Sequence, residues 1–298
     1  MSPARRPSSG RPPGRGGGRP TGRGGPARRG RPPGGGGEEE QHGTSARRGL
    51  GGEQVEGRQA VRELLLGGRR RVRDVWLVED IDTAPIIGDI LELADELRIK
   101  VRRVTRNQLD AEAKSEAPQG VLAHAAPLPE AELDTLCRRG RDGRPPFLLA
   151  LDGITDPQNV GALLRTAECA GVSGVLLPKH RAAHITPTVA KAAAGAVEHL
   201  DIALVSGLPA ALIRAKELGV WSVGLDGAGD TSLFDLTIAT EPVVLVLGAE
   251  GSGLSRLTQQ RCDVVAAIPL AGALSSLNVS AAGALACFEV ARRRVGPT

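Results

Sequence analysis

The sequence predicts an α/β protein whose larger, carboxyl-terminal part is a parallel sheet. From residue 147 onward, short β-branched apolar runs alternate with stretches whose apolar residues recur every three or four positions. Parallel strands need long, usually helical connections, so this alternation favours a parallel sheet covered by helices on both faces. Residues 53–126 repeat the alternation on a smaller scale. Residues 1–52 lack it, which predicts a small α/β domain preceded by a disordered tail.

The tail has an extreme composition. Residues 1–48 hold eleven arginines, no lysine and three glutamates, a net charge of +8, whereas the whole chain carries only +4. A segment of Arg, Gly and Pro cannot bury enough apolar surface to offset its ordering entropy. Its charge suits a polyanion such as nucleic acid, or an acidic membrane surface, and RGG-type tails bind RNA. A solvated leader without a specific role is the alternative.

Composition argues against several classes of protein. The four cysteines lack zinc or disulfide spacing, so we expect no metal, and Cys169 and Cys287 fall in apolar helical patterns that predict buried free thiols. No apolar run approaches the roughly 18 residues of a membrane span, and no secretory segment is evident, so we expect a soluble cytoplasmic protein. Five aromatic residues are too few for an aromatic platform that stacks RNA bases.

The small domain is expected to contain three helices and three strands. Apolar spacing predicts helices over residues 57–66, 86–97 and 106–113, and strands over 72–78, 99–104 and 120–125. Four arginines at 69–73 either contact RNA phosphates or complement the dipole at a helix end. Residues 127–146 are rich in proline and charge, which predicts a linker with a short helix at 130–137.

The larger domain, residues 147–298, is expected to contain six strands and five helices. The predicted strands are 147–151, 174–177, 201–205, 220–225, 243–247 and 264–268. The predicted helices are 159–170, 186–196, 208–218, 254–260 and 279–294. Loops at the carboxyl ends of such strands are where open α/β sheets bind ligands.

The first of these loops follows the strand at 147–151. Asn159 lies where a helix N-cap is expected, and that is its simplest role. Arg165 lies beside the apolar stripe of the following helix and could hold a phosphate or a developing oxyanion. The alternative is a surface pair with Glu168 at i,i+3, worth only about 0.2–0.5 kcal/mol.

The second and third loops follow the strands at 243–247 and 264–268. The sequence GAEGSG at 248–253 is neither GxGxxG nor a phosphate loop, and the carboxylate of Glu250 favours a neutral or cationic ligand. Three candidates for a single N-cap precede the last helix, namely Ser275, Ser276 and Asn278. Those that do not cap the helix are available for other contacts. The small residues at 281–284 allow close packing of that helix.

Three ordered motifs carry a family resemblance. DPQNVGALLRTAECAGV at 156–172, VLGAEGSGL at 246–254 and IPLAGALSSLNVSAAGALACFEVARRR at 268–294 resemble the SpoU (TrmH) branch of the SPOUT RNA 2′-O-methyltransferases. GRQAVRELL at 57–65 and PQGVLAHA at 118–125 are similar to the L30e-like RNA-binding domain of the subfamily that methylates guanosine in 23S rRNA. Arg58 and Gln59 stand where that subfamily usually has Ile-His.

The resemblance implies a deep trefoil knot over residues 243–283. S-adenosylmethionine would be bound there by backbone groups of Gly248, Ile268 and Leu277. Crossing backbones would explain the small residues Gly251, Gly253, Ala271 and Gly272. Family members are homodimers with sites completed across the interface, and the last helix, with Leu285, Phe288 and Val290, is the expected dimer element or part of the core.

The resemblance also implies the site and the reaction. The residues matching the family's functional positions are Asn159, Arg165, Glu250, Ser276 and Asn278. The expected reaction is methyl transfer to a ribose 2′-hydroxyl, with Arg165 positioning a phosphate and stabilising the oxyanion. Glu250 would orient Arg165 or the substrate, Asn159 would hold the first loop, and Ser276 and Asn278 would shape the third loop and bind substrate. Two alternatives are a tRNA ribose 2′-O-methyltransferase and a non-catalytic RNA-binding or ribosome assembly factor.

Overall fold

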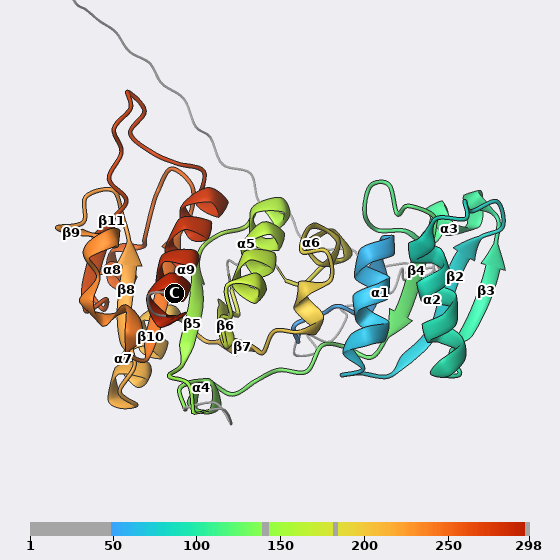
Figure 1. The fold of residues 1–298 in the computed structure, drawn as a ribbon, viewed down its shortest axis with the longest axis horizontal. Helices are drawn as coiled ribbons and strands as arrows, with labels where there is room; N and C mark the ends of the chain where they lie inside the picture. The colour runs from blue at the N-terminus through green and yellow to red at the C-terminus, as the bar shows by residue number, and fades with distance from the viewer. Residues whose placement is uncertain (1–48, 139–142, 181–183, 296–298) are drawn as a thin grey trace, which may run out of the picture. The chain divides into compact units, whose positions relative to one another are not determined.

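The computed structural model describes residues 49–138, 143–180 and 184–295 (Figure 1). All of them belong to one compact unit, Ser45–Thr298. The predicted disordered tail lies outside the described residues, except for residues 49–52. Leu50 is buried in the core of the larger sheet, so ordered packing begins before the predicted boundary at residue 53.

The smaller sheet has four strands in the order β1-β4-β2-β3, which are Gln54–Glu56, Val121–Ala125, Val72–Val78 and Lys100–Val104. Strands β2 and β3 are parallel, and β4 runs antiparallel to β1 and β2. Helices α1 (Arg58–Gly67) and α2 (Pro85–Glu96) pack on one face, and α3 (Arg106–Glu112) packs near the other. The six predicted elements are confirmed to within one residue. Strand β1 was missed because three residues show no periodicity.

The larger sheet has seven strands in the order β7-β6-β5-β10-β8-β11-β9, and every pairing is parallel. In chain order the strands are β5 Phe147–Asp152, β6 Gly174–Pro178, β7 Ile202–Val205, β8 Trp221–Leu225, β9 Thr231–Ser232, β10 Val243–Gly248 and β11 Val264–Ala267. The predicted parallel sheet is confirmed. Only the two-residue edge strand β9 was not predicted.

Helices cover both faces of this sheet, as predicted. The helices are α4 Leu133–Leu136, α5 Pro157–Cys169, α6 Pro187–Ala192, α7 Leu208–Glu217, α8 Arg256–Gln259 and α9 Val279–Val295. Residues of α5, α6 and α9 form one apolar cluster with the sheet, and residues of α4 and α7 form the other. Helix α6 is shorter than predicted because Ala194 and Gly195 adopt left-handed conformations, with φ of 49° and 84°. Among these described helices, none is long and apolar enough to cross a membrane.

Two glycines permit very close packing around the predicted ligand-binding edge. A Cβ on Gly283 would lie 2.2 Å from Cδ2 of Leu163, so α9 approaches α5 as the small residues at 281–284 predicted. A Cβ on Gly248 would lie 2.1 Å from the carbonyl carbon of Gly253. The crowding expected at Gly251 and Gly272 is wrong, because a Cβ added to either residue would meet no atom within 4 Å.

The predicted burial is confirmed for Cys287 and wrong for Cys169. Cys287 is buried, and burial raises the pKa of its thiol to about 12. Cys169 is exposed because it lies at the end of α5, outside the stripe that contains Leu163 and Ala167. All four cysteines are free thiols.

Two arginines in the loop after α1 form internal bonds rather than an exposed basic patch. Arg70 donates to both carboxylate oxygens of Glu198, with Nε 3.0 Å from Oε2, and these side chains are only 2% and 1% exposed. Arg70 also donates to the backbone oxygens of Gly52 and Ala126. Arg69 donates to the backbone oxygen of Leu200. Neither predicted role of the arginine cluster therefore describes Arg69 and Arg70, which tie the smaller sheet to the segment before β7.

Candidate functional site

The carboxyl ends of β5 and β10 meet at the centre of the larger sheet. These strands are direct neighbours, and Asp152 pairs with Gly248 at their ends. The chain leaves β5 towards β6 on one side, while β10 has β8 on its other side. Loops at such a reversal of strand order form the usual ligand crevice of an open α/β sheet.

Helix α5 is capped by Asp156 rather than by Asn159. Oδ2 of Asp156 accepts a hydrogen bond from the backbone N–H of Asn159 at 2.9 Å, and Pro157 occupies the first helical position. The predicted capping role of Asn159 is therefore wrong. Its side chain is left available for contacts with other loops.

Asn159 joins the three predicted motifs. Its Nδ2 donates to Oε2 of Glu250 at 3.4 Å, and its Oδ1 accepts from Nδ2 of Asn278 at 3.0 Å. Oδ1 of Asn278 in turn accepts from the backbone N–H of Ser280 at 2.9 Å, which caps the start of α9. Asn278 thus serves both as a cap and as a contact between motifs. The structure brings together three of the five predicted catalytic residues.

Ser276 and two of the predicted cofactor residues line a cavity of about 150 Å³ beside this cluster. Its walls are formed by Leu225, Asp226, Gly227, Ala266, Ile268, Leu270, Ser275, Ser276, Leu277 and Ala282. Gly248 does not line it; its backbone packs against Gly253. Asp226 was not identified from the sequence. It directly follows β8, and the loops after β5, β10 and β11 contain the other site residues.

The lining of this cavity suits a largely apolar ligand that carries hydrogen-bond donors. Ile268, Leu270 and Leu277 offer apolar surface, and the carboxylate of Asp226 can accept bonds from hydroxyl or ammonium groups. A nucleoside with a cationic side chain fits this apolar surface and carboxylate better than an anionic dinucleotide does. Within the described part of the chain, no group of His, Cys, Asp and Glu could hold a metal ion.

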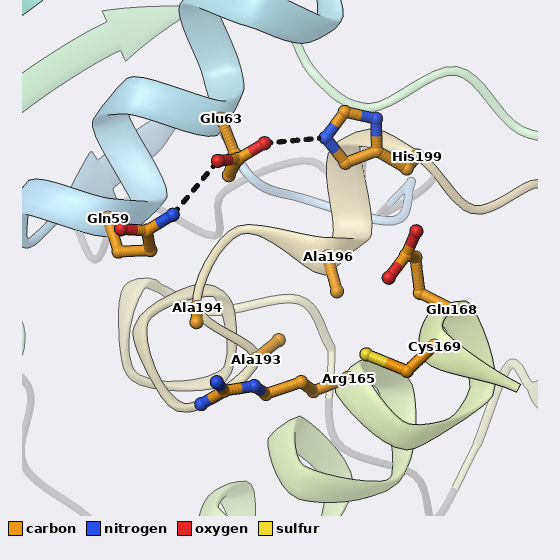
Figure 2. A pocket seen from close by; sticks show the side chains of 9 residues that line it. All are labelled: Gln59, Glu63, Arg165, Glu168, Cys169, Ala193, Ala194, Ala196 and His199. Carbon is orange, nitrogen blue, oxygen red and sulfur yellow. Dashed lines mark hydrogen bonds and ion pairs between the residues drawn. The ribbon is translucent and has the colours of Figure 1, made fainter. Parts of the chain in front are cut away.

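Arg165 lies in a different cavity, of about 430 Å³, between α5, α1 and residues 193–199 (Figure 2). Figure 2 shows its side chain reaching toward Ala193 and Ala194, while Glu63 and His199 lie across the cavity with Nε2 of His199 2.9 Å from Oε2 of Glu63. Arg165 has no hydrogen bond or ion pair with any residue that the structure describes, so the surface pair with Glu168 is not formed. One chain alone therefore does not bring Arg165 to Asn159.

The fold and the cluster agree with two family models. Residues 146–288 match the SpoU rRNA Methylase family, and residues 54–140 match RNA 2′-O ribose methyltransferase substrate binding. The chain belongs to the SpoU rRNA methylase family. The resemblance found in the three motifs is thereby confirmed.

Curated relatives and solved structures extend over most of the chain. It is 42% identical to 23S rRNA (guanosine-2′-O-)-methyltransferase RlmB of Pseudomonas aeruginosa, over 81% of this chain and 97% of the relative. It is 37% identical to the putative TrmH family tRNA/rRNA methyltransferase YacO of Bacillus subtilis, over 80% and 95%. Among solved structures, the SpoU methyltransferase AviRb from Streptomyces viridochromogenes, in complex with the cofactor AdoMet, superposes with a TM-score of 0.69 at 25% identity, over 82% and 91%.

Proposed function

We propose that this protein methylates the 2′-hydroxyl of a guanosine in 23S rRNA, with S-adenosylmethionine as methyl donor. The observation that carries the proposal is the hydrogen-bonded set Asn159, Glu250 and Asn278, beside the cavity lined by Ile268 and Leu277. The curated relatives with this activity align over four fifths of the chain, and residues 54–140 and 146–288 match the two family models.

The cavity residues would hold the cofactor. Ile268 and Leu277 would supply apolar contacts and backbone groups, and Asp226 would accept hydrogen bonds from the cofactor. Gly248 has no side chain, which allows its backbone to pack directly against that of Gly253. When bound, S-adenosylmethionine supplies a methyl group activated by a positively charged sulfur. The carboxylates of Asp226 and Glu250 favour such a cation over a phosphate-bearing ligand.

The side chains around the cofactor position the ribose and stabilise charge. Holding the 2′-oxygen in line with the methyl group accounts for much of the acceleration. Asn159 is fixed by Glu250 and Asn278, so its loop is preorganised for this task. Arg165 carries a permanent positive charge, which suits it to hold a neighbouring phosphate and to stabilise negative charge on the 2′-oxygen.

A second copy of the chain would complete the site. Arg165 is exposed and outside the cluster of its own chain, and α9 presents Leu285 and Phe288 at 44% and 50% exposure. Val290, in contrast, is buried in the core. We therefore assign Leu285 and Phe288 to a homodimer interface across which Arg165 of one chain reaches the cluster of the other.

The remaining expectations form part of the same proposal. Residues 53–126 are an L30e-like RNA-binding domain, residues 127–146 a linker, and residues 147–298 the methyltransferase domain, knotted over 243–283 and acting in the cytoplasm. Residues 1–52 add a basic tail whose eleven arginines attract RNA phosphates. The similarity of residues 54–140 to substrate-binding domains supports the assignment of the first domain.

The decisive experiment measures methyl incorporation from labelled S-adenosylmethionine into 23S rRNA from a strain lacking the protein. Arg165→Ala is expected to lower turnover by about 10²–10³-fold, because one charge-stabilising group is lost, and to leave cofactor affinity unchanged. Arg214→Ala removes an arginine that pairs with Asp134 on the opposite face of the sheet, and serves as the control. Unchanged turnover in Arg165→Ala would exclude its role.

The wild-type protein separates the alternatives in the same assay. Label in tRNA but not in 23S rRNA would identify a tRNA enzyme. RNA binding without any affinity for S-adenosylmethionine would identify a non-catalytic RNA-binding factor.

A further inference from the structure

The loop before β4, residues 114–120, has an unusual backbone. Ala117 and Gln119 have φ of 52° and 59°, in the left-handed region that residues other than glycine rarely adopt. Gly120 follows with φ of 74°. Such a conformation in a non-glycine residue is strained and persists only when surrounding contacts hold it. Backbone of this kind gathers at binding sites, so the contacts that hold the loop are informative.

The smaller sheet holds the loop from one side. Oε1 of Glu56, whose side chain is fully buried, accepts from the backbone N–H of Lys114 at 2.7 Å, and its Oε2 accepts from that of Ser115 at 3.0 Å. Oε1 of Gln119 accepts from the backbone N–H of Arg58 at 3.1 Å. Both ends of the loop are thus fixed to β1 and to the start of α1.

The larger domain holds the loop from the other side. Nζ of Lys191, on α6, donates to the backbone oxygen of Ala117 at 2.6 Å and to that of Glu116. A side chain from α6 therefore bonds to the middle of the loop, where Ala117 has its left-handed conformation. Contacts with both sheets' domains therefore fix the conformation of the loop.

A cleft of about 650 Å³ lies between this loop and the first turns of α5 and α6. It is lined by Lys114, Ser115, Glu116, Gln119, Asp156, Pro157, Gln158, Thr188, Lys191 and Ala192. The next residue after Gln158 is Asn159, at the centre of the proposed methyl-transfer site. The cleft therefore adjoins the place where the target ribose must lie.

The chemistry of the cleft matches a nucleotide. The amide of Gln158 and the hydroxyl of Thr188 can both donate and accept hydrogen bonds, as the edge of a base requires, and the NH2 group of Gln119 can donate. The hydroxyl of Ser115 already donates to Oε2 of Glu56, so towards a ligand it can only accept. Lys114 adds an ammonium group that can contact a phosphate. Two acidic residues in the lining balance the two lysines, so hydrogen bonding rather than net charge would select the ligand.

A second cavity continues from the same loop. Gln119 also lines a space of about 470 Å³ together with Arg58, Asp80 and Arg106 of the smaller domain. One residue thus borders both cavities, and a strand of RNA that leaves the site through the cleft would reach the domain whose family model is named for substrate binding.

We infer that this cleft binds the RNA nucleotide adjacent to the one whose ribose is methylated. The inference rests on the proposed function for the position of the target ribose. The ligand is a segment of single-stranded RNA, because an unpaired base can present its edge to the amides of the cleft.

The test compares RNA affinity and methyl transfer in two variants of the full chain. Thr188→Trp fills the cleft from α6, and Lys191→Gln releases the middle of the loop. Each is expected to weaken binding of an unmodified 23S rRNA transcript by about 10-fold, the effect of losing one or two hydrogen bonds to a base. Affinity for S-adenosylmethionine is expected to stay within twofold of wild type.

A matched control removes the same charge elsewhere. Lys216→Gln, at a position of α7 whose side chain is 69% exposed on the opposite face of the larger sheet, is expected to change RNA affinity by less than threefold. A transcript carrying 4-thiouridine should crosslink to peptides containing residues 114–120, which a purely structural role would not produce.

Three outcomes would overturn the inference: wild-type RNA affinity in both cleft variants, an equal loss in Lys216→Gln, or crosslinks confined to other surfaces. A wild-type protein that binds the transcript but transfers no methyl group would refute the proposed function instead. The affinity and crosslinking comparisons would still decide whether RNA occupies the cleft.

Discussion

Removing Arg70 is expected to separate the unfolding of the two sheets. Arg70 and Glu198 form an ion pair that is almost completely buried, and Arg70 also bonds to the backbone oxygens of Gly52 and Ala126. Arg70→Ala leaves the Glu198 carboxylate in the interior with no positive partner. The two carbonyl groups lose their donor as well.

The expected cost follows from burial. Removing one partner of a buried ion pair costs about 3–5 kcal/mol of unfolding free energy, because the remaining charge is uncompensated. The double variant Arg70→Met, Glu198→Leu removes both charges and is expected to recover part of that loss, because the backbone oxygens of Gly52 and Ala126 still lack their donor. Together with the single variants Arg70→Met and Glu198→Leu it forms a double-mutant cycle that is predicted to be strongly non-additive.

Two tryptophans make the separation measurable by fluorescence during guanidinium unfolding. The chain has only Trp76, on β2 of the smaller sheet, and Trp221, on β8 of the larger sheet, and it has no tyrosine. Variants that retain one tryptophan, made by Trp→Phe substitution, report each sheet alone. The transitions should coincide with Arg70 present and separate in Arg70→Ala, with the Trp76 transition at lower denaturant.

An exposed ion pair provides the control. Arg214 and Asp134 are 45% and 43% exposed, so Arg214→Ala should leave the denaturation midpoint close to that of wild type and both transitions together. The reasoning is refuted if Arg70→Ala costs less than about 1 kcal/mol, or if its two transitions remain coincident.

Three further predictions concern α9. Gly283→Val places carbon atoms against Leu163 and should lower the unfolding free energy by at least about 1–3 kcal/mol, measured by thermal denaturation. Hydrogen bonds from Arg292, and also from Arg293, lower the pKa of Glu289 to about 2, so its stabilisation is present above pH about 4.3 and is lost as the pH falls toward 2. Glu289→Gln should therefore be less stable than wild type by about 1–2 kcal/mol at pH 7 and equally stable near pH 2, by urea titration. Phe288→Asp should yield monomers in sedimentation while secondary structure is retained, and a dimer of unchanged affinity would exclude this face.

The regular elements could be predicted because their signals are local. The strands of the larger sheet are continuous apolar runs, and those longer than two residues were recognised to within one residue or so at each end. Short pieces such as β1 and β9 carry no periodicity, so tertiary pairing alone defines them. The end of α6 depends on the left-handed Ala194, a conformation that its residue type does not indicate.

The site residues could be predicted in part because family motifs mark them. The hydrogen bonds and ion pairs that these side chains form could not be predicted. Asn159 and Asp156 are equally good caps by residue type, and Pro157 at the first helical position favours Asp156. The contact of Asn159 with Glu250 joins residues far apart in the sequence, so no local pattern predicts it. Arg70 looks like an exposed basic residue in the sequence, since its partner Glu198 lies 128 residues away. The position of Arg165 in another cavity follows from its phase on α5, six residues beyond Asn159.

The two hydrogen bonds of Asn278 make activity depend on the local stability of the first turn of α9. Oδ1 holds the first turn of α9 while Nδ2 holds Asn159, so fraying of that turn withdraws the amide from the site. Helix ends open at lower free energy than the protein as a whole. On heating, methyl transfer should therefore decline while both sheets are still intact, and the gap between inactivation and melting would measure the local stability of one helical turn.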